Sequence, residues 1–148
     1  MKNPYPNADP GVGLRSVAKL IEAKVGLQYA WVDQFGWDTH ENQPARLNGV
    51  IKNLSASLAA FSEDMQSKNQ PYTLVVLTEF GRRLRSNRSN GTDHGHGSLG
   101  MIMGSNVPGG RVMGRWPGLN TSDLDRGVDL AVTTDYQYFL NAAFKYQK

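Results

Sequence analysis

The chain has 148 residues, of which 39% are hydrophobic and 20% charged, with a formal net charge of +3 and no cysteine. This length and balance are typical of one globular domain and argue against a disordered or fibrous chain. The lack of cysteine excludes disulfides, thiolate metal sites and a cysteine nucleophile. No apolar run approaches the roughly 20 residues that cross a bilayer, and residues 1–20 lack the pattern of a signal peptide, so we expect no membrane span.

The first predicted element is a helix after Asp9 and Pro10, with Asp9 as its cap and Pro10 in its first turn. Apolar residues continue at helical spacing as far as Val25, and Gly26 is expected to end the element. Residues 27–32 are then typical of a short strand. This part of the chain therefore predicts a surface helix with one buried stripe, followed by a strand.

The middle of the chain contains the clearest helix and the clearest strand. Apolar residues keep a helical period from Pro44 to about Met65. After a polar break, residues 73–78 form a continuous β-branched and apolar run. Such a run is typical of a strand that is buried on both faces, so we interpret this one as the central strand of the sheet.

The last third of the chain alternates glycine-rich loops with short apolar segments. Residues 82–97 are polar and rich in glycine, and they precede a short apolar run at 99–103. A hairpin-like turn is expected at 108–110. A final helix is predicted to begin near Thr134 and Asp135.

Alternation of strands and helices predicts an α/β fold over residues 1–148, with a mostly parallel sheet flanked by helices. In such sheets ligands bind beyond the carboxyl ends of the strands. The segments 38–40 and 79–82 each follow a predicted strand, although they lie far apart in the sequence. We therefore expect their side chains to converge at one edge of the sheet.

All three histidines of the chain lie beside acidic residues, in the segments 38–40 and 93–96. Residues two apart in an extended segment point the same way, so Asp38 can reach the same point as His40, and His94 the same point as His96. Imidazole and carboxylate are the usual zinc ligands when cysteine is absent. We predict a divalent metal, with Zn first and Mn, Fe or Ca as the alternatives. The predicted ligands are Asp38, His40, Glu79, Asp93, His94 and His96.

Other interpretations of these residues stay open. The histidines can instead hydrogen-bond loop backbone, and Glu79 can be an exposed acid that pairs with Arg82 or Arg83. Arg82 is the candidate for holding an anionic ester through its fork of donors. A nucleic-acid partner is disfavoured, because the basic run at 82–88 has no interleaved aromatic residues and the net charge is low.

Several segments together resemble the DUF1501 family, and they follow one another in the order of that family's pattern over nearly the whole chain. The strings Gly36-Trp37-Asp38-Thr39-His40 and Asp93-His94-Gly95-His96 are the specific ones when both occur. The other matching segments are Tyr5-Pro6, Leu14 to Ala18, Asn42-Gln43, Thr78 to Arg82, Gly109-Gly110 with Val112 and Gly114, and Thr134-Asp135-Tyr136.

The DUF1501 family is related to alkaline phosphatases and sulfatases, so the resemblance implies an alkaline phosphatase-like sheet with one or two divalent metals. It also implies a small phosphate or sulfate ester as substrate. Relatives carry an Asp-His-Gly string where this chain reads Glu79-Phe80-Gly81, which keeps the carboxylate and loses the imidazole. Full-length members, which are often exported, place the nucleophile and a further acidic ligand in a preceding half. The resemblance therefore matches the C-terminal part of the family, as a fragment or a shortened relative, with the missing half on the same or a partner chain.

Two hypotheses about function follow. The first is a metal-dependent module of a hydrolase acting on phosphate or sulfate esters. The second is a non-catalytic binding or assembly module that keeps the fold without turnover, which the loss of the imidazole at Phe80 favours.

Overall fold

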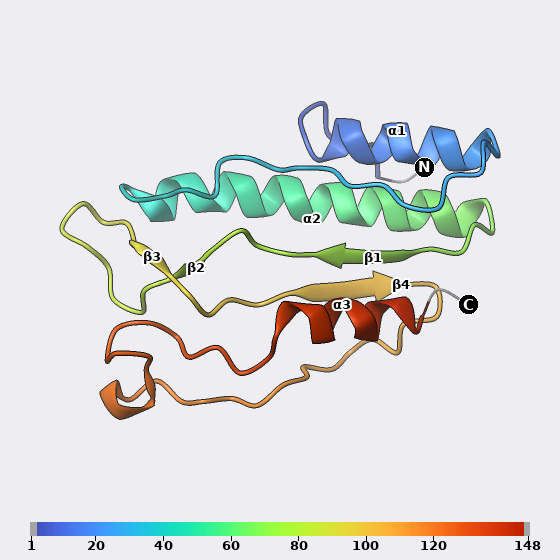
Figure 1. Ribbon diagram of the computed structural model, residues 1–148. Coiled ribbons are helices and arrows are strands. Elements are labelled where there is room, and N and C mark those ends of the chain that lie inside the picture. Colours follow the sequence, from blue (N-terminus) through green and yellow to red (C-terminus); the bar gives the residue numbers. More distant parts are fainter. Residues whose placement is uncertain (1–2, 147–148) are drawn as a thin grey trace. The chain divides into compact units, whose positions relative to one another are not determined.

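The computed structural model describes residues 3–146, which form three α-helices, one short 3₁₀-helix and two sheets of two strands each. In chain order the elements are α1 (Gly11–Glu22), α2 (Gln43–Ser67), β1 (Thr73–Val76), β2 (Gly81–Arg82), β3 (His94–Gly95), β4 (Met101–Gly104), η1 (Thr121–Asp123) and α3 (Tyr136–Phe144). The chain divides into two compact units, one containing α1 and α2 and the other containing the remaining elements (Figure 1). None of the described helices combines the length and the apolar character that crossing a bilayer requires.

The first unit pairs α1 with the longer helix α2, and the two lie side by side (Figure 1). Leu14 and Ala18 form the buried stripe of α1, and Phe61 and Met65 are buried on α2. Both helices therefore form where the apolar periodicity predicts them, because each has one apolar stripe to remove from water.

The two ends of α1 differ from the prediction. The helix is preceded by Pro10 and has no side-chain cap hydrogen bond among the described residues, so the predicted role of Asp9 as a cap is wrong. The main-chain carbonyl of Asp9 instead accepts a hydrogen bond of 2.7 Å from the side chain of Asn53. The helix ends at Glu22 rather than at Gly26, because Lys24 already has a positive φ of 54°.

A buried polar contact fastens the start of the chain to α2. The Tyr5 hydroxyl donates a hydrogen bond of 3.0 Å to Oδ2 of Asp64, and both side chains are buried. Burial and the Asp64 carboxylate raise the pKa of Tyr5, so the hydroxyl keeps its proton and remains a donor. Lys68 Nζ lies 3.0 Å from the other Asp64 oxygen and 3.0 Å from Oε2 of Glu22 on α1.

We expect Tyr5→Phe to lower the free energy of unfolding by about 1.5 kcal/mol, because a buried carboxylate would lose a donor that it cannot replace with water. Chemical denaturation followed by circular dichroism measures this change. Tyr138→Phe is the matched control, since Tyr138 is exposed on α3. Equal stability of the two variants would show that the Tyr5 hydroxyl contributes nothing.

The predicted strand at 27–32 is absent from the described structure, where these residues belong to no helix or strand. Trp31 is 87% exposed, so the apolar and aromatic residues of this segment do not form a buried face. A strand needs a partner for its main-chain groups, and β1 uses a different partner.

The second unit contains the strand that was predicted to be central. β1 pairs antiparallel with β4, from Thr73 opposite Gly104 to Val76 opposite Met101, and α3 packs against β1 (Figure 1). The residues of β1 are half-buried rather than buried on both faces. The carboxylate of Asp135 caps α3 by accepting a hydrogen bond of 2.7 Å from the main-chain N–H of Gln137, which confirms the predicted helix start.

The predicted parallel sheet flanked by helices is therefore wrong. A parallel pair of strands requires a crossover, usually a helix, but residues 77–100 between β1 and β4 contain only the short strands β2 and β3. β2 and β3 are themselves antiparallel, with Gly81 opposite Gly95 and Arg82 opposite His94. The chain thus reverses direction between β2 and β3, and most of the candidate site residues lie on this small pair and its loops.

Candidate metal centre

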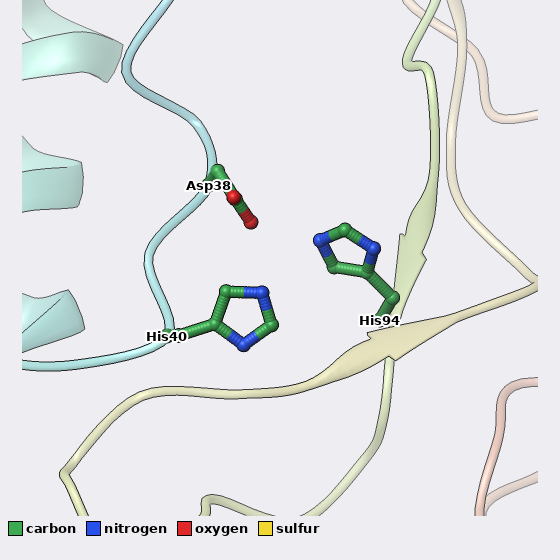
Figure 2. Close-up of side chains that lie close together, drawn as sticks. All are labelled: Asp38, His40 and His94. Atoms are coloured by element: carbon green, nitrogen blue, oxygen red, sulfur yellow. The ribbon is translucent and has the colours of Figure 1, made fainter.

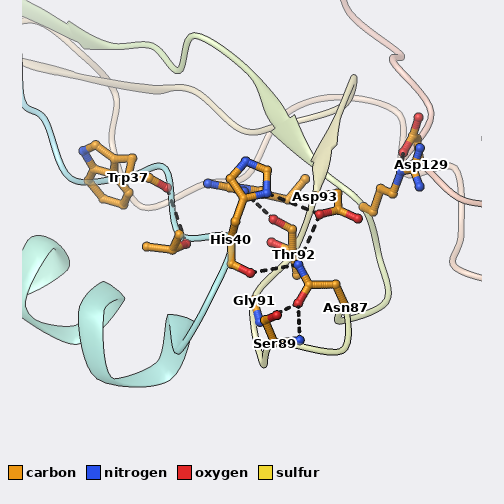
Figure 3. Close-up of polar contacts among 11 residues, drawn as sticks. Trp37, His40, Asn87, Ser89, Gly91, Thr92, Asp93 and Asp129 are labelled. Atoms are coloured by element: carbon orange, nitrogen blue, oxygen red, sulfur yellow. Dashed lines mark hydrogen bonds and ion pairs between the residues drawn. The ribbon is translucent and has the colours of Figure 1, made fainter.

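A loop centred on Asn87 holds His40 in the second unit (Figure 3). The Asn87 amide donates hydrogen bonds of 2.8 Å to the main-chain carbonyl of His40 and of 3.1 Å to Oδ1 of Asp93. Its side-chain oxygen accepts from the main-chain N–H groups of Ser89 and Gly91, at 2.9 and 3.1 Å. One asparagine therefore closes its own loop and fixes the position of His40 relative to Asp93.

Main-chain contacts fix the same loop from the other side. The N–H of Asn42 donates a hydrogen bond of 2.9 Å to the carbonyl of Ser89, and Glu41 forms an isolated β-bridge with Asn90. Gly91 is buried directly against the main chain of His40, where a β-carbon would overlap the carbonyl group. A glycine is required at this position because two main chains approach each other closely.

The imidazole of His40 is oriented by Asp93. Its Nδ1 lies 3.3 Å from Oδ1 of Asp93. Hydrogen bonds from Asn87 and from His40 hold the pKa of Asp93 below its ordinary value, so its carboxylate stays ionised. If Nδ1 donates to this carboxylate, Nε2 becomes the ring's acceptor nitrogen, as in the carboxylate–histidine pairs of metal sites.

His94 lies beside His40 (Figure 2). Its ring also stacks on that of Phe80. The centroids of the two imidazole rings are 4.8 Å apart, and the His94 ring is stacked on the Phe80 ring with a centroid separation of 3.9 Å. The guanidinium carbon of Arg82 lies 4.7 Å from the centroid of the Phe80 ring, and the same group donates a hydrogen bond to the carbonyl of Thr92. The ring of Phe80 therefore packs against the imidazole of His94.

The structure brings some of the predicted ligands together and separates others. His40 lies beside both His94 and Asp93. Asp38 is exposed on the segment that leads into His40 (Figure 2). Glu79 is exposed and belongs to no group of three or more candidate metal ligands among residues 3–146.

His96 does not join His94, so the prediction that these two rings share one point is wrong. Its Nδ1 lies 2.8 Å from Oδ2 of Asp125 and 3.8 Å from Oδ2 of Asp129. The two-residue strand β3 ends at Gly95. Two residues further on, the N–H of Gly97 donates to the carbonyl of Leu130 instead of continuing the pairing with β2. The alternation rule therefore fails between His94 and His96. Asp125 and Asp129 were not predicted from the sequence, because no histidine or glycine-rich motif lies next to them in the chain.

A pocket of about 200 Å³ lies beside Asp93, and its lining includes Arg83, Arg85 and Asn87. Arg82, the predicted anion-binding residue, contributes nothing to this lining. The lining is mixed, since it also includes Leu124 and Val128. Its two arginines are the groups suited to an anionic ligand, because guanidinium groups bind phosphate and sulfate through paired donors.

Comparison with curated proteins finds no match, and comparison with solved structures finds none either. The sequence model of one family, described as "Protein of unknown function (DUF1501)", matches residues 4–143. This match covers the Asn87 loop and all of the histidines and acidic residues described above. The chain therefore belongs to the DUF1501 family.

Proposed function

We propose that the chain is the metal-binding module of a hydrolase that acts on phosphate or sulfate esters, with His40 and His94 as ligands of a divalent transition metal. The observation that carries the proposal is that these two rings, one from the loop before α2 and one from β3, lie at a centroid separation of 4.8 Å. Nitrogens bound to one zinc ion lie about 4 Å apart at most, and rings at this separation can satisfy that limit.

The surrounding residues have distinct roles in this proposal. Asp93 orients the ring of His40, and Asn87 holds Asp93 in place. Asp38, two residues before His40, is the carboxylate that we predict from the sequence as a further ligand. The relationship to alkaline phosphatases and sulfatases that we expect from the sequence supports a metal in this role, and we propose that the chain corresponds to the C-terminal part of such an enzyme.

A bound divalent cation would polarise an ester oxygen or lower the pKa of a bound water. Arg83 and Arg85, at the wall of the pocket beside Asp93, would hold the anionic part of the ester. This assignment replaces Arg82, whose guanidinium group is engaged with the carbonyl of Thr92 and the ring of Phe80.

A non-catalytic binding module is the second candidate, and the Phe80 ring favours it. The ring covers one side of His94 at 3.9 Å, where relatives carry a metal-binding imidazole. A chain with this substitution can keep one metal ion and lose the second that a hydrolase of this class would use.

Metal binding is tested first. Bound ions are removed from the chain with a chelator, and zinc binding is then measured by calorimetry and by thermal melting. Zinc at a hundredfold excess over its dissociation constant should stabilise the chain by about 2.7 kcal/mol. His40→Gln should weaken the zinc affinity of this site at least about tenfold, because it removes a ligand from a largely exposed loop without leaving a cavity. Asp33→Asn, which removes an exposed carboxylate from the first unit, should bind zinc like the unchanged chain.

Turnover then separates the two candidate functions. Hydrolysis of an aryl phosphate or aryl sulfate by the zinc-loaded chain, lost in His40→Gln, would support the hydrolase. Zinc binding at His40 without any turnover would support the non-catalytic module. Equal zinc affinity of the unchanged chain, His40→Gln and His94→Gln would exclude both.

A further inference from the structure

We infer that His96, Asp125 and Asp129 form a second binding site for a divalent transition metal, separate from the one at His40 and His94. All three residues belong to the second unit. One nitrogen of His96 and one oxygen of each carboxylate lie within 4.8 Å of one another. Main-chain hydrogen bonds position all three side chains, and the side chain of Asp129 is buried.

A tight turn places the two carboxylates together. The N–H of Asp125 donates a hydrogen bond of 2.9 Å to the carbonyl of Asp129, and the N–H of Asp129 donates one of 3.1 Å in return. Arg126 and Gly127, within the turn, both have a positive φ, of 52° and 71°. Residues that exchange both main-chain hydrogen bonds project their side chains to the same face. The carboxylates of Asp125 and Asp129 therefore lie close together.

His96 is brought to this turn by the neighbouring main chain. The N–H of Gly97 donates a hydrogen bond of 3.1 Å to the carbonyl of Leu130, one residue beyond Asp129. Gly97 is buried there, and a β-carbon would overlap the main chain of Leu130. The contact sets His96 Nδ1 at 2.8 Å from Asp125 and 3.8 Å from Asp129.

The carboxylate of Asp129 is the independent sign of a ligand. Its side chain is only 9% exposed, and its Oδ1 is buried without a hydrogen-bond donor in the described part of the chain. The nearest cation, Nε of Arg83, lies 3.7 Å from Oδ1, which is beyond hydrogen-bond distance. A buried carboxylate with an unsatisfied oxygen is costly, and a bound cation would offset that cost.

A simple ion pair does not explain the arrangement. An exposed pair between His96 and Asp125 accounts for their 2.8 Å contact. It leaves Oδ1 of Asp129 buried without a hydrogen bond, with only the ion pair to Arg83 at 3.7 Å. One imidazole and two carboxylates are a mixed nitrogen and oxygen set, which suits Zn²⁺ or Mn²⁺ better than Mg²⁺ or Ca²⁺. Three protein ligands also leave at least one position for water or a substrate oxygen.

The test uses the fact that the chain has three histidines, so that each ring can be followed by nuclear magnetic resonance. A zinc titration of the full chain at constant pH, recorded on the ring nitrogens, should shift the signals of His96. Asp129→Asn should weaken the zinc affinity reported by the His96 ring at least tenfold and leave that reported by His40 and His94 unchanged. Asp125→Asn is the second variant, in case Asp129→Asn does not fold, and Asp33→Asn is the control.

The converse variant separates the two sites. His40→Gln should abolish the response of the His94 ring and leave that of His96 intact, so failure at one site does not affect the conclusion about the other. The second site is ruled out if zinc leaves the His96 ring unshifted. It is equally ruled out if the affinity reported by His96 is the same in Asp129→Asn and Asp125→Asn as in the unchanged chain.

Discussion

Replacement of Gly91 with alanine is expected to remove zinc binding at His40 and to lower the free energy of unfolding by about 3 kcal/mol. The new β-carbon would overlap the main-chain carbonyl of His40 and the N–H of Glu41. Overpacking costs about 1–3 kcal/mol, and the upper end applies here because the obstructing atoms are main chain and cannot rotate away. The overlap can be relieved only if the loop that carries His40 moves away from residue 91.

Calorimetric zinc titration and chemical denaturation measure the two effects of Gly91→Ala. Gly109→Ala is the matched control, because a β-carbon at Gly109 meets no atom within 4 Å. We expect this control to bind zinc normally and to keep its stability. If Gly91→Ala also retained zinc affinity, the close packing of the Asn87 loop on His40 would have no role in the site.

Truncation of Met65 to alanine is expected to cause the largest loss of stability, about 2–5 kcal/mol. Met65 is fully buried on α2, with an exposed fraction of 0%. Removal of its side chain loses apolar burial and leaves a cavity in the helical unit, which can collapse only in part.

Thermal and chemical denaturation of Met65→Ala check this expectation, with Met113→Ala as the control. Met113 is 69% exposed in the second unit, so its truncation should change stability by less than about 0.5 kcal/mol. Met65→Leu keeps most of the volume and should recover most of the loss. Similar midpoints for Met65→Ala and Met113→Ala would place the core of the first unit elsewhere.

The helices of this protein could be predicted from the sequence because their signals are local. The apolar period of α2 and the Asp135 cap of α3 each depend on residues within a few turns of chain. The pairing of the strands was harder to predict, because the apolar run in β1 is equally compatible with a parallel and with an antiparallel partner. The expectation of a buried, parallel strand failed because the partner, β4, lies across a connection that contains no helix.

The same difference between local signals and long-range contacts applies to the candidate sites. The sequence by itself determined that His40, Asp93 and His94 are metal-ligand types in glycine-rich segments. Only the tertiary structure decided that His40 meets His94 and that His96 pairs with Asp125 and Asp129. The physical reason is that side-chain chemistry is a property of each residue, whereas convergence depends on main-chain hydrogen bonds between distant segments, such as those of Asn87 with His40 and of Gly97 with Leu130.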